Sequence, residues 1–108
     1  MDIEICIDIC EICRDTCVEC AEISHHAGNM EDCDDACHRA AQACRDCLER
    51  MLENSTELCA DCAALCQECA NICEQYDLEY CAKCADNCRQ CAAICDQMAV
   101  TSSRGFIL

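Results

Sequence analysis

The chain has 108 residues and a formal net charge of −15, from 22 acidic against 7 basic residues. Such a negative surface repels phosphates and attracts cations, so the composition excludes a nucleic-acid-binding protein. The chain carries 19 cysteines but only two Tyr, one Phe and no Trp, and a small domain so poor in large apolar side chains usually needs disulfides or metal to be stable.

Cysteines recur every three or four residues in four segments, which is the spacing of one face of an α-helix. Residues 2–24, 31–53, 56–74 and 78–99 are the predicted helices, and the tail 100–108 abandons the pattern. Ala40 stands where the second stripe would otherwise carry another cysteine. The candidate metal ligands are the stripe residues Cys6, Cys10, Cys13, Cys17, Cys20, Cys33, Cys37, Cys44, Cys47, Cys59, Cys62, Cys66, Cys69, Cys73, Cys81, Cys84, Cys88, Cys91 and Cys95.

Four helices of this length with short connections predict an all-α fold, an up-down-up-down antiparallel four-helix bundle with a cysteine-lined core. We expect residues 1–108 to form this single domain. The first and third connections then lie at one end, which we call the open end because it gathers His25, His26, Met30, Tyr76, Asp77 and Tyr80. The chain termini and the second connection lie at the other, the closed end, with the apolar residues Ile3, Ile5, Leu48, Met51, Leu52, Leu58, Ile94 and Met98.

The sequence predicts a cytoplasmic protein that does not enter the membrane. No apolar run reaches membrane-spanning length, and the N-terminus lacks the basic region and cleavage site of a signal peptide. Thiols stay reduced in the cytosol, where dense cysteine patterns indicate metal binding more than disulfides. An odd count of 19 cysteines also fits a disulfide framework poorly.

The cysteine stripes favour Cu(I) among the metals that bind thiolates. Thiols alone would fill a core poorly. A zinc ion held by four thiolates leaves a charge of −2, which is costly in a buried core without Lys or Arg. A Cu(I) ion that replaces one thiol proton leaves the charge unchanged. Iron–sulfur clusters need cysteines that converge from separate positions, and regular stripes do not provide them.

The four helical stripes of C-x-x-C and C-x-x-x-C resemble the bacterial copper storage proteins over residues 2–99, and the cytosolic branch of that family most closely. The resemblance implies many Cu(I) ions per bundle, with all 19 cysteines as ligands, and a tetrameric homo-oligomer. It also implies that copper enters through His or Met ligands at one end, which His25, His26 and Met30 match in kind. The third connection, E-Q-Y-D-L-E-Y, departs from the His-rich form of some relatives.

The resulting prediction is a cytosolic copper storage or buffering protein, not an enzyme, with a copper chaperone as donor or acceptor. Two alternatives remain open at this point. One is a zinc or mixed-metal buffer similar in purpose to metallothionein. The other is a thiol redox protein, although C-x-x-C without a β-α-β context is a weak indication of that chemistry.

Overall fold

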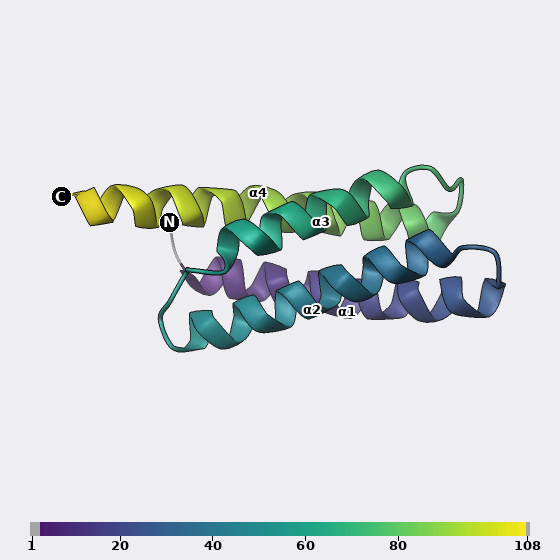
Figure 1. The fold of residues 1–108 in the computed structure, drawn as a ribbon, viewed down its shortest axis with the longest axis horizontal. Helices are drawn as coiled ribbons and strands as arrows, with labels where there is room; N and C mark the ends of the chain where they lie inside the picture. Colours follow the sequence, from purple (N-terminus) through teal and green to yellow (C-terminus); the bar gives the residue numbers. More distant parts are fainter. Residues whose placement is uncertain (1–2, 108) are drawn as a thin grey trace.

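Four helices run back and forth along one long axis in the computed structural model, which describes residues 3–107 and the side chains of residues 3–100 (Figure 1). The helices are α1 (Ile3–Ala27), α2 (Glu31–Leu52), α3 (Cys59–Cys73) and α4 (Glu79–Ile107). The α1–α2 and α3–α4 connections lie at one end, and the α2–α3 connection lies at the other (Figure 1). The predicted antiparallel four-helix bundle is therefore confirmed.

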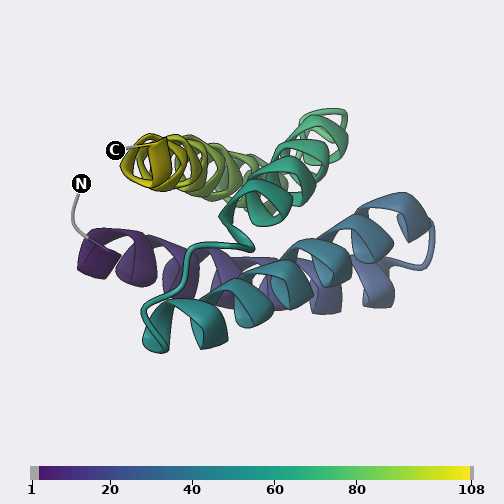
Figure 2. The ribbon, with the colours of Figure 1, turned by 60° about the vertical axis from the view of Figure 1, so that its left-hand side comes forward.

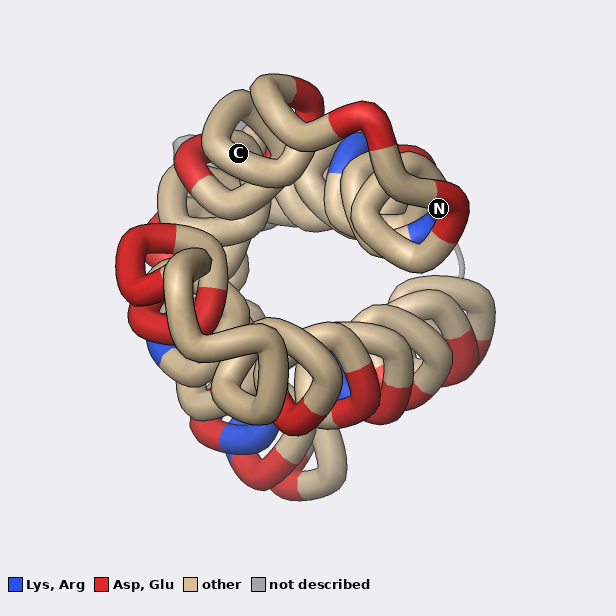
Figure 3. The backbone as a smooth tube through the Cα atoms, turned by 90° about the vertical axis from the view of Figure 1, so that its right-hand side faces the viewer, with Lys and Arg blue, Asp and Glu red and all other residues tan. Residues whose placement is uncertain are grey.

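The helices form a ring around a shared axis. In the described part of the chain, α1 packs against α2 and α4, and α3 packs against the same two helices. The diagonal pairs meet through cysteine side chains on the axis, as between Cys13 and Cys66 and between Cys37 and Cys84. Figure 2 shows the two helix pairs crossing at an angle, and Figure 3, an end-on view, shows the acidic positions around the outside of the ring. None of the described helices combines the length and the hydropathy needed to cross a membrane.

The ends of three helices differ from the sequence prediction. α1 continues to Ala27, so the two histidines predicted in the connection lie in its last turn. Gly28 follows with φ +80°, a conformation that costs other residues about 1–2 kcal/mol. α3 begins only at Cys59, because a turn in which the Cys59 amide donates to the Thr56 carbonyl precedes it.

The tail does not leave the helical path, because α4 continues to Ile107. The chain contains no proline, and a helix ends abruptly only where the backbone or a cap forces it to. The prediction that the tail leaves the helix is therefore wrong for the backbone of residues 100–107. The side chains of residues 101–108 lie outside the described set.

The closed end is sealed by fewer apolar side chains than the sequence predicts. Leu48, Met51 and Met98 are buried, and such burial stabilises a fold by about 1.5–3 kcal/mol per side chain. Ile5 and Leu52 are instead 50% and 76% exposed, so their assignment to this plug is wrong. Ile5 precedes a stripe cysteine and points away from the axis, and Leu52 is the last residue of α2. The remaining three predicted members pack partly against the core: Ile3, Leu58 and Ile94.

Candidate metal centre

All 19 cysteines are free thiols, and each is at most 1% exposed. The three-and-four spacing turns every one toward the bundle axis, as predicted. Ser24 is the single buried polar residue among the described side chains, and no charged side chain there is buried. Ala40 is also fully buried, so it occupies a core position without a ligand atom. The core is therefore uncharged and lined by sulfur along its length.

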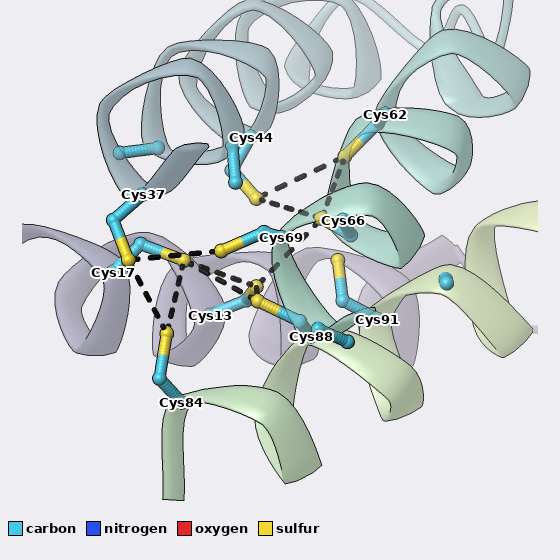
Figure 4. Close-up of a cluster of buried hydrophobic side chains, with 14 of the residues drawn as sticks. Cys13, Cys17, Cys37, Cys44, Cys62, Cys66, Cys69, Cys84, Cys88 and Cys91 are labelled. Atoms are coloured by element: carbon cyan, nitrogen blue, oxygen red, sulfur yellow. Dashed lines mark hydrogen bonds between the residues drawn. The ribbon is translucent and has the colours of Figure 1, made fainter. Parts of the chain in front are cut away.

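The sulfur atoms lie close enough to share metal ions. The Sγ atoms of Cys17 and Cys88 are 3.5 Å apart, those of Cys47 and Cys59 3.6 Å, and those of Cys6 and Cys95 3.9 Å. Figure 4 shows cysteine side chains from all four helices, Cys17 and Cys88 among them, pointing toward one another. A disulfide bond measures about 2.0 Å, so these contacts join separate thiols.

The thiols fall into groups whose Sγ atoms all lie within 4.8 Å of one another. Two of the groups take one cysteine from each helix. Toward the open end two groups share Cys84, and toward the closed end neighbouring groups share Cys91 or Cys95. The group with Cys17 meets the group with Cys13 through a contact of 3.8 Å between Cys88 Sγ and Cys13 Sγ. The shared thiols and this contact form a continuous column, which we call the thiol column. The groups of four are Cys20/Cys37/Cys73/Cys84, Cys17/Cys69/Cys84/Cys88, Cys13/Cys44/Cys66/Cys91 and Cys10/Cys62/Cys91/Cys95, and a group of three, Cys6/Cys59/Cys95, lies at the closed end.

Proton affinity varies along the column because thiols hydrogen-bond to one another. Hydrogen bonds from neighbouring thiols, that of Cys17 first, lower the pKa of Cys69. Hydrogen bonds from Cys20, from two further thiols and from Ser24 similarly lower the pKa of Cys33. Burial raises the pKa of Cys81 to about 12. A thiolate is the form that binds metal, so the first two positions favour that form and Cys81 favours the protonated one.

The open end carries a pocket beside this column, which we call the opening, with the sulfur of Met30 in its lining. Met30 is 4% exposed, and its Sδ accepts a hydrogen bond of 3.3 Å from the Tyr80 hydroxyl. The buried Ser24 hydroxyl donates to Cys33 Sγ over 3.4 Å. This pocket, of about 370 Å³, borders both Met30 and Ser24. Its lining residues are Ser24, His25, Gly28, Met30, Glu31 and Asp34. The Tyr76 hydroxyl donates to Asp32 across the same end.

The two histidines predicted at this end have different surroundings. His25 and His26 are both exposed, with ring centroids 6.0 Å apart. His25 Nδ1 lies 3.3 Å from Asp34 Oδ2 and lines the pocket, whereas His26 does not line it. Met30 is the predicted residue that lies deepest.

Ser24 was not predicted as part of the opening, although it stands four residues after Cys20 and continues the first stripe. Tyr80 was predicted at this end, but nothing in the sequence indicated its partner. Its contact with Met30 joins the start of α4 to the start of α2, and only the packing of the helices brings these together.

Comparisons with known proteins agree with this geometry. The family model for the copper storage proteins matches residues 1–100. The solved structure of the Cu(I)-bound copper storage protein BsCsp3 superposes with a TM-score of 0.84 at 29% sequence identity, covering 89% of this chain and 96% of that one. No curated protein sequence matches the chain. The family model covers nearly the whole bundle of four cysteine-striped helices. The chain therefore belongs to the copper storage protein family.

Proposed function

We propose that this protein stores Cu(I), with many ions held by the thiolates of the thiol column, and that it is not an enzyme. The carrying observation is the continuity of the column: groups in each half share cysteines, and the two halves meet through the contact of Cys13 with Cys88, so adjacent ions can share bridging sulfurs. The similar BsCsp3 is Cu(I)-bound. A chaperone or catalyst needs one or two accessible sites, whereas every cysteine here is buried.

The net charge of the metal sites distinguishes copper from zinc, whereas the distances between sulfur atoms do not. Sulfurs of a zinc tetrahedron with bonds of about 2.3 Å lie about 3.8 Å apart, which the thiol contacts also satisfy. Each such zinc site, however, carries −2, and the described core contains no buried cation to offset it. Cu(I), which thiolates also prefer, replaces a proton with an equal charge and leaves the column neutral.

We infer that copper enters at the open end, where Ser24, His25 and Met30 line the pocket. The Ser24 hydroxyl donates to Cys33 Sγ and so links this pocket to the column. The lowered pKa of Cys33 favours the thiolate there. From this position ions can pass between groups by exchange at shared sulfurs. His26 belongs to the same proposal as an exposed capturing residue beside His25, and a copper chaperone is the expected donor or acceptor at this end.

The proposed location is the cytosol, because the column needs reduced thiols. Neighbouring sulfurs at 3.5–4.0 Å would be oxidised readily in a disulfide-forming compartment. Cell fractionation is the direct check: the proposal expects reduced, copper-bearing protein in the cytosolic fraction, and recovery from an exported fraction would contradict it.

Anaerobic titration with Cu(I) against a competing chelator tests the storage proposal. We expect saturation well above five ions per chain, because all 19 cysteines line one column. Saturation below about five ions would refute storage, because 19 thiols that bind metal in separate sets of four, without sharing, hold fewer than five ions. Native mass spectrometry after growth with added zinc or added copper separates the zinc-buffer alternative. Turnover of peroxide with a thiol reductant would favour the redox alternative.

We also propose that the chain forms a homo-oligomer, as in the tetramer implied by the family resemblance. The supporting observation is the outer face of α1, where Ile5 and Ile12 are 50% and 55% exposed one heptad apart. Sedimentation equilibrium is expected to give a mass of several chains, and Ile12→Lys to reduce it. A monomer at micromolar concentration in the unsubstituted protein would contradict the proposal.

A further inference from the structure

Asp34 differs from the other carboxylates of the described chain. Every other described Asp and Glu is exposed, whereas Asp34 is half-buried, with 19% of its side chain exposed. Its Oδ1 atom is shielded from solvent and has no partner with hydrogen-bond geometry. Withdrawing a carboxylate from water is costly unless another group compensates its charge. The surroundings of Asp34 must therefore supply that compensation.

Two imidazoles face this carboxylate, one at each oxygen. His25 Nδ1, from the last turn of α1, lies 3.3 Å from Oδ2. His38 Nε2, one turn further along α2, lies 3.0 Å from Oδ1, but not in hydrogen-bond geometry. Because no hydrogen bond occupies that pair, the nitrogen and the oxygen can both turn toward a common cation. Donor atoms from two helices thus meet at the two oxygens of one carboxylate, outside the thiol column.

We propose that His25, Asp34 and His38 form a second kind of metal site, for a divalent transition ion such as Zn²⁺. Imidazole and carboxylate are ligands that suit zinc, at about 2.0–2.2 Å, whereas Cu(I) selects thiolates. One carboxylate and two neutral imidazoles leave the bound ion with a charge of +1. The acidic surface of the chain, with its net −15, favours such a charge.

The position of the site leaves room for further ligands. His25 and Asp34 line the pocket of about 370 Å³ at the open end, together with Glu31. Three protein ligands then leave a coordination position that water from this pocket can occupy. A purely structural role for Asp34 is the competing explanation, because an acidic side chain in the first turn of α2 is also stabilised by the helix dipole. Metal binding by matched variants separates the two.

The experiment loads the reduced protein with Cu(I), counts the copper, and then measures Zn²⁺ binding by calorimetry. We expect about one Zn²⁺ per chain at this site and a loss of affinity of at least about tenfold in Asp34→Asn and His38→Ala. Asp35→Asn is the matched control. It removes the same charge one position along, from an exposed carboxylate whose partner is Arg39, and should leave the affinity unchanged.

Equal losses in Asp34→Asn and Asp35→Asn would overturn the site, since general attraction to the acidic surface would then explain the binding. Absence of Zn²⁺ binding would overturn it as well. A second titration adds Zn²⁺ to metal-free, reduced protein. NMR follows the imidazole resonances of His25 and His38, which should shift together. This readout does not depend on copper loading, so a failure of the storage proposal, visible in the copper count, stays distinguishable from a failure of this site.

Discussion

Loading the thiol column with Cu(I) is expected to raise the midpoint of thermal unfolding by at least about 20 °C. The metal-free core consists mainly of cysteine and alanine, with a few methionines and Leu48, and such small side chains provide little apolar burial. Each site filled at one hundred times its dissociation constant adds about 2.7 kcal/mol. Several sites that exist only in the folded bundle therefore add more than a typical domain's whole stability.

Circular dichroism at 222 nm during anaerobic heating, before and after loading, measures this effect. The loaded sample treated with a strong Cu(I) chelator is the control, and its midpoint should return to the metal-free value. A shift below about 5 °C at saturation would mean that copper binds outside the folded core, since about 1 kcal/mol already produces a shift of that size. That result would remove the structural basis for storage.

Blocking the middle of the thiol column should reduce copper loading more than blocking its closed end. Ions that enter at the open end must pass the group Cys13/Cys44/Cys66/Cys91 to reach the last cysteines. Replacing these four by alanine removes their own capacity and also isolates the cysteines beyond them. The matched variant replaces four closed-end cysteines instead, all in direct contact with one another in pairs: Cys6 with Cys95 and Cys47 with Cys59.

Both variants lose four of the 19 thiols, so storage without passage predicts equal capacities. Passage along the column predicts that the middle variant takes up copper in a fast phase about half as large as that of the unsubstituted protein. Stopped-flow absorbance of the copper–thiolate bands at fixed Cu(I) measures the phase, and helix content by circular dichroism verifies the fold. Equal fast phases in the two variants would show that copper reaches the closed end by another route.

The order of the cysteines along the chain already determined much of this protein. Steps of three and four place Cys59, Cys62, Cys66, Cys69 and Cys73 on one face of one helix, because helical periodicity is a local property of the backbone. Four such segments with short connections leave few arrangements other than the observed bundle. The choice of Cu(I) over zinc likewise follows from composition, since charge neutrality does not depend on exact positions.

Tertiary structure alone decided which side chains from different helices meet. The sequence places His38 off the stripe and offers no reason to join it to His25, yet both lie against Asp34. Contacts between helices depend on the rotation and the stagger of each helix, which arise from packing along the whole bundle. For the same reason, the contact of Tyr80 with Met30 could not be read from the spacing of the residues.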